Sequence, residues 1–255
     1  MAHSAVYPDL KGRSVLITGG ASGIGAEIVA HFCAQGACVG FVDLDDTAAE
    51  ALITNIRGAG HAAPVFEPCD LRDIDALRAA IGRLREQIGP IRVLVNNAAN
   101  DERHAIDDVT PEYWDDRQAV NLRHQFFATQ AVWHDMRDTG GGAIVNMGSV
   151  SWLIGQGGMP AYSAAKAAVA GLTRSLARDL GEHGIRVNSV LPGWIMTERQ
   201  VTKWLTPEGE ADLMRNQCLK RKLYPADIAR VVLFFASEAS SACTNQNYIA
   251  DGGWV

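Results

Sequence analysis

The 255-residue chain has no long basic run, no membrane-length apolar run and no leader-like start. Its formal net charge is −6 and its isoelectric point is near 5.6, whereas nucleic-acid binders usually carry a basic patch. Residues 1–11 lack the apolar centre of a signal peptide, and no apolar run reaches the ~20 residues that span a bilayer. We therefore expect neither nucleic acid nor a membrane as a partner.

Cysteine and histidine are present, but not in patterns that bind metals or form a disulfide framework. The five cysteines are odd in number and show no Cys-x-x-Cys spacing. Because disulfides persist mainly in oxidising compartments, unpaired thiols favour a cytoplasmic location. The seven histidines show no His-Glu-x-x-His spacing, so we expect no metal site. A chain of this length can bury a hydrophobic core without disulfides or bound metals to stabilise it.

Short apolar runs alternate with longer amphipathic segments along the chain. The apolar runs predict strands at 14–18, 37–43, 63–67, 92–95, 142–147, 185–191 and 247–250. The amphipathic segments predict helices at 22–35, 73–88, 110–137, 160–180 and 225–237. Continuous apolar strands joined by helices are typical of parallel sheets. The sequence thus predicts an α/β protein: a single domain over residues 1–255, with a doubly wound, Rossmann-type parallel sheet flanked by helices.

A glycine-rich segment, TGGASGIG at 18–25, joins the first expected strand to the first expected helix. Glycines allow a tight turn and close approach of the backbone to a pyrophosphate, and the helix start offers free N–H groups. A glycine turn between a strand and a helix is typical of dinucleotide binding. We predict that this turn contacts a dinucleotide through Gly19, Ser22, Gly23, Ile24 and Gly25.

Acidic residues follow the second and third expected strands. Asp43 ends the second strand, close to the ~20-residue spacing at which a ribose-binding carboxylate is expected. A carboxylate there accepts from both ribose hydroxyls and repels a 2′-phosphate, which favours NAD over NADP. Asp70 and Leu71 follow the third strand, where they are predicted to hold the adenine.

Tyr162 and Lys166 lie one helical turn apart, ~5–6 Å at Cβ. A cation beside a phenol favours the phenolate, so we expect a pKa of Tyr162 below its usual ~10, as a general base requires. Ser149 follows the fifth strand, on the side where parallel sheets bind ligands. Asn121 lies inside the 110–137 helix, where asparagine is unfavourable, and predicts a local distortion that anchors a water. Each residue alone also fits an ordinary structural role.

Together these residues resemble the short-chain dehydrogenase/reductase family over nearly the whole chain. The family's motifs are matched by the glycine turn, by Asn96-Asn97-Ala98-Ala99, in which Ala99 replaces a glycine, by Tyr162-x-x-x-Lys166 and by Pro192-Gly193. The resemblance implies NAD as the cofactor, with NADP less favoured, and a homotetramer. It implies a catalytic set of Asn121, Ser149, Tyr162 and Lys166. It also implies further cofactor contacts from Asn97, Ala98, Val120, Tyr162, Lys166, Pro192, Gly193, Ile195 and Thr197.

Segments 97–104, 121–124, 206–211 and 217–220 carry a closer resemblance, to bacterial aldose 1-dehydrogenases of the D-xylose, L-arabinose and L-fucose kind. This resemblance implies NAD-dependent oxidation of the anomeric C1 hydroxyl of a free pentose, hexose or 6-deoxyhexose to the lactone. Polar groups and tryptophan rings suit a sugar. The predicted substrate contacts are Asn100, His104, Ser149, Ser151, Trp152, Tyr162 and Trp194. The long connection at about 194–224 is expected to cover the site.

Two other functions remain open from the sequence. One is the same fold acting on another alcohol or ketone, such as a polyol, a steroid or a 3-oxoacyl thioester, although Asp43 argues against the NADPH that a carrier-linked substrate favours. The other is a non-catalytic NAD-binding sensor, a kind of protein that usually lacks part of the catalytic set. Trp254, near the C-terminus, is expected to be exposed and to reach a neighbouring subunit.

Overall fold

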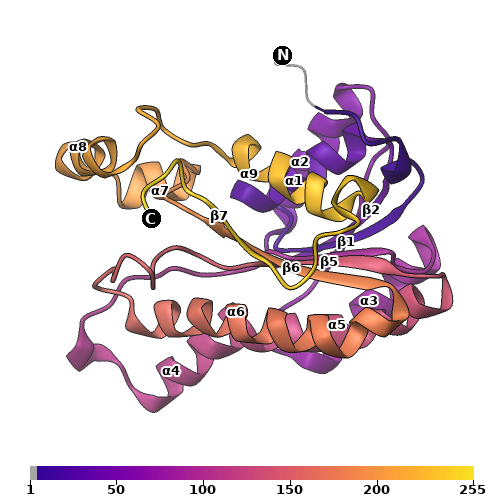
Figure 1. Ribbon diagram of the computed structural model, residues 1–255, viewed down its shortest axis with the longest axis horizontal. Helices are drawn as coiled ribbons and strands as arrows, with labels where there is room; N and C mark the ends of the chain where they lie inside the picture. The colour runs from indigo at the N-terminus through magenta and orange to yellow at the C-terminus, as the bar shows by residue number, and fades with distance from the viewer. Residues whose placement is uncertain (1–4) are drawn as a thin grey trace.

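The computed structural model describes residues 5–255 and places one parallel sheet between two layers of helices (Figure 1). Within that range the strand order is β3-β2-β1-β4-β5-β6-β7, and each neighbouring pair is parallel. The predicted α/β, doubly wound class is therefore confirmed. The strands are β1 (Ser14–Thr18), β2 (Cys38–Asp43), β3 (Val65–Pro68), β4 (Val93–Asn96), β5 (Gly142–Met147), β6 (Ile185–Pro192) and β7 (Asn247–Ala250).

The helices form two layers and a smaller outlying group (Figure 1). One face of the sheet is covered by α1 (Gly23–Ala34), α2 (Asp46–Gly58) and α9 (Pro225–Ala236). The other face is covered by α3 (Ile74–Ile88), α4 (Pro111–Gln118), α5 (His124–Asp138) and α6 (Pro160–Leu180). The outlying group follows β6 and consists of α7 (Glu198–Lys203) and α8 (Pro207–Asn216). In Figure 1 these two helices lie beside the C-terminus.

Strand β1 shows why its sequence is apolar throughout. All five of its residues are buried. Val15 and Ile17 belong to the core beneath α1 and α9, whereas Leu16 belongs to the core beneath α3 and α5. Because successive side chains of a strand point to opposite faces, covering both faces removes the polar alternation that a half-exposed strand would show.

The helix expected over 110–137 begins as predicted but is interrupted. Thr110 caps α4 by accepting a hydrogen bond from Tyr113 N (3.2 Å), and a proline is the first helical residue. A π-helical turn, Ala119–Arg123, then separates α4 from α5. Asn121 lies in this turn, so the predicted distortion at that residue is confirmed. Such turns inside α-helices occur frequently at functional sites.

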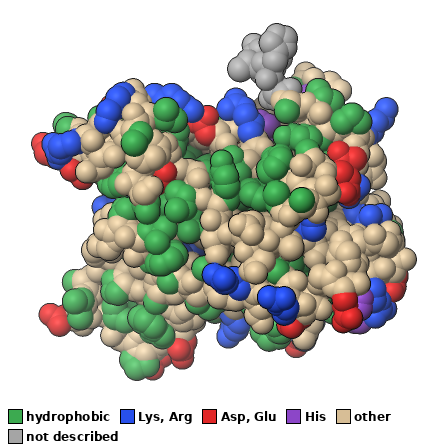
Figure 2. Space-filling view, in the orientation of Figure 1, with side chains coloured by type: hydrophobic (Ala, Val, Ile, Leu, Met, Phe, Trp, Pro, Cys, Tyr) green, Lys and Arg blue, Asp and Glu red, His purple; other side chains and the backbone are tan. Residues whose placement is uncertain are grey.

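The surface mixes charged and apolar groups. Figure 2 shows acidic and basic side chains interspersed on one face, with hydrophobic side chains gathered near its middle. In β7, Tyr248 and Ile249 are exposed large apolar residues. Among residues 5–255, no helix is both long and apolar enough to cross a membrane.

Candidate active site

A cleft of about 460 Å³ lies beyond the carboxyl ends of the central strands. The sheet order reverses between β1 and β4, which is where doubly wound sheets bind their ligands. The cleft is lined by Ile24 of α1, Ser149 after β5, Tyr162 of α6 and Trp194 after β6. Segments far apart in the sequence thus meet at one edge of the sheet.

The glycine turn before α1 is too tightly packed for side chains. Gly19 and Gly23 have positive φ angles, +66° and +56°. A Cβ on Gly25 would overlap the carbonyl oxygen of Gly19 and lie 2.6 Å from Asn97 Nδ2. Asn97 Nδ2 donates to the carbonyl oxygens of Thr18 (3.1 Å) and Gly19 (2.8 Å), which fixes the turn.

This cradle fits the phosphates of a dinucleotide. No side chain caps the first turn of α1, and Ser22 before it is exposed, so the N–H groups of that turn remain available to an anion. Gly23 packs close to Thr197, since a Cβ there would lie 3.3 Å from Thr197 Cγ2. The predicted cofactor residues that line the cleft itself are Ile24, Asn97, Tyr162, Lys166, Pro192, Gly193, Ile195 and Thr197.

Gly25→Ala is expected to lower the free energy of unfolding by about 3 kcal/mol, because the new methyl group must displace backbone atoms. Gly82→Ala is the matched control. Gly82 lies in α3, where an added Cβ would meet no atom within 4 Å, so this change should stabilise the helix by about 0.5–1 kcal/mol. Urea unfolding of both variants measures the difference. Equal stabilities would contradict the close packing of the turn.

Asp43 is held beside the glycine turn. Its Oδ2 accepts from Ala21 N (2.8 Å), and its Oδ1 accepts from Leu44 N (2.7 Å). The carboxylate is half-buried and retains further lone pairs. The end of β2 therefore presents a fixed negative charge next to the start of α1.

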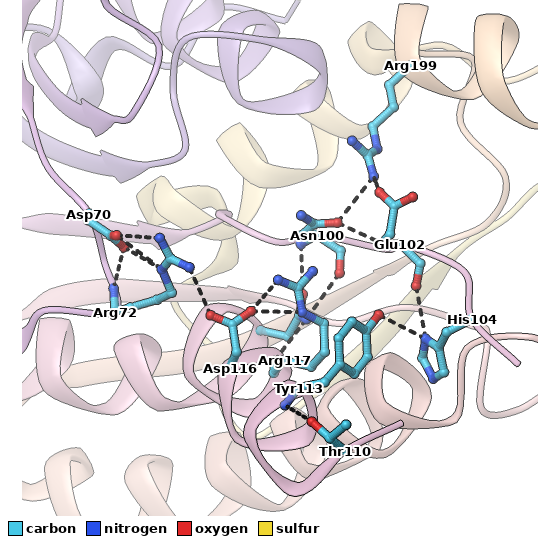
Figure 3. Close-up of polar contacts among 11 residues, drawn as sticks. Asp70, Arg72, Asn100, Glu102, His104, Thr110, Tyr113, Asp116, Arg117 and Arg199 are labelled. Atoms are coloured by element: carbon cyan, nitrogen blue, oxygen red, sulfur yellow. Dashed lines mark hydrogen bonds and ion pairs between the residues drawn. The ribbon is translucent and has the colours of Figure 1, made fainter. Parts of the chain in front are cut away.

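Asp70 has a partner that the sequence did not predict. Arg72 donates to both of its carboxylate oxygens and also contacts Asp116 of α4 (2.9 Å, Figure 3). The hydrogen bonds from Arg72 hold the pKa of Asp70 below its usual value. Leu71 is buried. An adenine at this edge would meet an already paired carboxylate.

Tyr162 and Lys166 have the predicted spacing but not the predicted electrostatics. Lys166 is 1% exposed, lies 5.7 Å from the centre of the Tyr162 ring and donates to Met147 O (2.7 Å). Burial lowers the pKa of Lys166 to about 7. The pKa of Tyr162 is raised, first by withdrawal of its hydroxyl from water and then by the Asp101 carboxylate, while a hydrogen bond with Ser149 lowers it. The expectation of a depressed pKa of Tyr162 is therefore wrong for this state, because burial and the Asp101 carboxylate outweigh the hydrogen bond with Ser149.

Ser149 is oriented by its own loop. Its Oγ accepts from Ser151 N (3.1 Å), which leaves its hydroxyl proton free to donate. Tyr162 and Ser149 thus present two hydroxyl groups to the same part of the cleft.

A chain of buried side-chain hydrogen bonds fixes α6 against the sheet. Asn96 Nδ2 donates to Asn146 Oδ1 (2.9 Å), and Asn146 Nδ2 donates to Thr173 Oγ1 (3.0 Å). All three residues are buried. These two hydrogen bonds tie the helix that carries Tyr162 to strands β4 and β5.

The loop after β4 is held from two sides by residues that the sequence analysis missed. Thr18 Oγ1 accepts from the backbone N–H groups of Asn97 (3.0 Å) and Ala98 (3.1 Å). On the other side, His124 Nε2 lies 3.1 Å from Ala98 O. Burial lowers the pKa of His124 to about 3, so the neutral ring donates from Nε2 to that carbonyl. The signal for His124 lay in its place three residues after Asn121.

Asn121 holds the same loop from the π-helical turn. Its Oδ1 accepts from Asn100 N (2.8 Å), and its Nδ2 donates to Asn100 O (3.1 Å) and Arg117 O (2.9 Å). Both N–H donors of the amide are therefore occupied by backbone carbonyls. The observed role of this side chain is to fix the loop against the helix, and Val120 beside it is half-buried.

The predicted substrate contacts fall into two groups. Ser149, Ser151, Tyr162 and Trp194 line the cleft. The other three, Asn100, His104 and Trp152, are not among its lining residues. Asn100 Oδ1 accepts from Arg199 (3.2 Å) and from Glu102 N, and the His104 ring shares a hydrogen bond with the Tyr113 hydroxyl (3.0 Å, Figure 3). Trp152 is 37% exposed. Asn100 and His104 thus build the loop that borders the cleft.

Several cleft-lining residues were not in the predicted site. Trp254 is half-buried and lines the cleft of its own chain, so the expectation that it is exposed is wrong. The polar residues and tryptophans of the 194–224 segment were the available signal. The unpredicted lining includes Gln200, Trp204, Thr206, Asp212 and Trp254.

Comparisons with known proteins place the chain in a family. Residues 19–255 match a family model described as enoyl-(acyl carrier protein) reductase. The chain is 49% identical to D-xylose 1-dehydrogenase of Caulobacter vibrioides, covering 98% of this chain and 99% of that one. It is also 49% identical to a probable galactose dehydrogenase of Rhizobium meliloti, covering 98% of each. The structure of a 7α-hydroxysteroid dehydrogenase complexed with NADH has a TM-score of 0.91 at 31% identity, covering 96% of each chain.

The chain belongs to the short-chain dehydrogenase/reductase family, as the resemblance predicted. Members of this family use nicotinamide dinucleotides. Within the family it is a dehydrogenase that acts on CH–OH groups, homologous to sugar 1-dehydrogenases.

Proposed function

We propose that this dehydrogenase oxidises the anomeric C1 hydroxyl of a free aldose, a pentose, hexose or 6-deoxyhexose, to the lactone with NAD. The observation that carries the proposal is the composition of one cleft. The cleft contains Ser149, Tyr162 and Lys166. It also contains Trp194 and Trp204, so the hydroxyl groups of the catalytic residues lie in the same cleft as aromatic rings. Aromatic rings suit the apolar face of a sugar ring, and convergent polar groups suit its hydroxyls.

The reaction needs a proton acceptor beside the substrate oxygen. A bound nicotinamide dinucleotide supplies the hydride acceptor. Tyr162, as the phenolate, takes the proton from the C1 hydroxyl, while Ser149 hydrogen-bonds the same oxygen as it becomes a carbonyl. The contact between these two hydroxyls is the place that a substrate oxygen takes over. Lys166 holds the nicotinamide ribose, and Asn121 keeps the adjoining loop in position.

The cofactor is held along the sheet edge in this proposal. The start of α1 binds the pyrophosphate, and the ordered carboxylate of Asp43 accepts from the adenosine ribose hydroxyls. Asp70 and Leu71 border the adenine. This assignment makes NAD the preferred cofactor over NADP.

We also propose that residues 194–224 cover the substrate within a single domain of 1–255. Arg199 of α7 supports this: its Nε donates to Asp101 Oδ1 (3.1 Å) and its Nη2 to Glu102 Oε2 (2.8 Å), both in the loop after β4. These ion pairs hold α7 against the rim of the cleft. Since partly exposed ion pairs contribute little stability individually, such a cover can release product.

A panel of aldoses and polyols, each offered with NAD and with NADP, tests the proposal. Reduction of the nicotinamide is followed by its near-ultraviolet absorbance. We expect turnover of at least one aldose with NAD, with a lactone as the first product. Turnover of polyols but no aldose would contradict the sugar assignment, and faster rates with NADP would contradict the role of Asp43.

The proposed enzyme is a cytoplasmic homotetramer. The five cysteines are unpaired in the structure, which fits a reducing compartment. Exposed Tyr248 and Ile249 on β7, together with small residues along α6, supply faces on which copies can pack. Light scattering coupled to size-exclusion chromatography measures the assembly.

A further inference from the structure

Arg103 is a cation in the cleft that has no carboxylate partner among the residues that the structure describes. It follows β4 and lines the cleft together with Ser149 and Tyr162. Its Nε is buried without a hydrogen-bond acceptor, and none of its nitrogens makes an ion pair within residues 5–255. A guanidinium has five N–H donors and no acceptor, so leaving it unpaired away from water is unfavourable.

Trp204 supplies a second unpaired donor beside it. This residue ends α7 and lines the same cleft. The Arg103 guanidinium lies 4.5 Å from the centre of its ring, and its own Nε1 is buried without a partner among the described residues. Trp194 differs, because its Nε1 donates to Gln200 Oε1 (2.9 Å).

The neighbouring carboxylate of Asp101 is already paired with residues of α7. Asp101 Oδ1 accepts from Arg199, and its Oδ2 accepts from Gln200 Nε2 (2.6 Å). The same contacts hold α7 in the place that brings Trp204 over Arg103. The loop after β4 and α7 therefore bring two buried donors without acceptors, Arg103 Nε and Trp204 Nε1, into one part of the cleft.

We propose that Arg103 and Trp204 bind one ring hydroxyl of the sugar, remote from C1, through the lone pairs of its oxygen. A hydroxyl oxygen supplies the acceptor that both groups lack. The sugar ring, lying against tryptophan, is oriented by this bond with C1 toward Tyr162. Arg103 and Trp204 are then specificity-determining residues for the aldose. The inference rests on the proposed sugar dehydrogenase function and identifies the residues that recognise the substrate.

The subsite is tested by combining a substitution in the enzyme with the removal of single hydroxyl groups from the substrate. The aldose that the wild-type enzyme turns over fastest is compared with each of its monodeoxy analogues. We expect one analogue to lose about 10- to 100-fold in kcat/KM, the range for a hydrogen bond to a charged group. In Arg103→Met, kcat/KM for the parent sugar should fall by the same factor, mainly because KM rises. For that analogue, kcat/KM should be little lower in Arg103→Met than in the wild-type enzyme.

Two further variants separate recognition from a structural role. Trp204→Phe keeps an aromatic face for Arg103 and removes only the N–H donor, so it should lower discrimination against the same analogue by a smaller factor. Arg103→Lys keeps the charge without the planar fork and should restore part of the discrimination. Thermal unfolding of each variant shows whether the fold is retained.

The outcomes are distinguishable. An equal loss for the parent sugar and every analogue in Arg103→Met would assign Arg103 to support of α7 and overturn the subsite. A uronic acid that outperforms the neutral aldose in the wild-type enzyme, but not in Arg103→Met, would assign a carboxylate to Arg103 and overturn the hydroxyl. If no aldose is turned over at all, the proposed function fails and the subsite falls with it.

Discussion

Tyr162→Phe is expected to lower kcat/KM for aldose oxidation by about 100- to 10,000-fold, the range for loss of a positioned general base. Phenylalanine keeps the ring that packs beside Lys166 and Ser149 and removes only the hydroxyl. The loss should fall on kcat, because the proton is transferred in the transition state. Affinity for NADH, measured by quenching of tryptophan fluorescence, should change little.

The pH profile makes this prediction specific to the phenol. The protein raises the pKa of Tyr162 in the cofactor-free state. Oxidation needs the deprotonated form, whose fraction grows as pH rises toward that pKa. The wild-type kcat/KM should therefore rise from neutral to alkaline pH, and the residual activity of Tyr162→Phe should lack that rise. Tyr248→Phe, on exposed β7, is the control and should keep both rate and profile. Near-normal turnover in Tyr162→Phe would remove Tyr162 from the chemistry.

The fold was predictable because both faces of the sheet are covered. A strand buried on both sides must be apolar at every position, so runs such as 14–18 and 142–147 stand out in the sequence. Boundaries were less certain: the third strand begins at Val65 instead of residue 63, and the 194–224 connection contains two helices. Helix α7 buries no residue and helix α8 buries only Leu213, so their sequences carry little of the apolar pattern that predicts a helix.

The residues that act through local geometry were also predictable. A glycine turn and the spacing of Tyr162 and Lys166 are properties of a few consecutive residues. The pKa of Tyr162 is different, since it depends on how much protein surrounds the hydroxyl and on Asp101, 61 positions away in the sequence. The sequence predicted the spacing of the two residues correctly and the direction of the pKa shift of Tyr162 wrongly.

The walls of the cleft depend on contacts between distant segments. Arg199 reaches Asp101 across 98 positions, and Trp254 lines the cleft from the last residues of the chain. No spacing rule connects such pairs. His104 and Arg103 illustrate the consequence: they are neighbours in sequence, yet one hydrogen-bonds Tyr113 and the other lines the cleft.

Asp43→Asn is expected to lower the preference for NAD over NADP by about 100-fold or more. The change removes a charge-assisted hydrogen bond to the ribose of NAD and also the like-charge repulsion that disfavours a 2′-phosphate, and both effects act in the same direction. Asparagine keeps the shape of the side chain and an oxygen for Ala21 N, so the glycine turn should persist. The ratio of kcat/KM for the two cofactors, at saturating sugar, measures the effect.

Leu44 offers a way to extend the same change. Its side chain is 65% exposed directly after Asp43, so an arginine there would disturb no core. Asp43→Asn combined with Leu44→Arg should favour NADP outright, because the guanidinium pairs with the added phosphate. Asp46→Asn, an exposed carboxylate in the first turn of α2, is the matched control and should leave the ratio unchanged. An unchanged ratio in Asp43→Asn would show that the carboxylate at the end of β2 does not bind the ribose, and that other residues determine the preference for NAD.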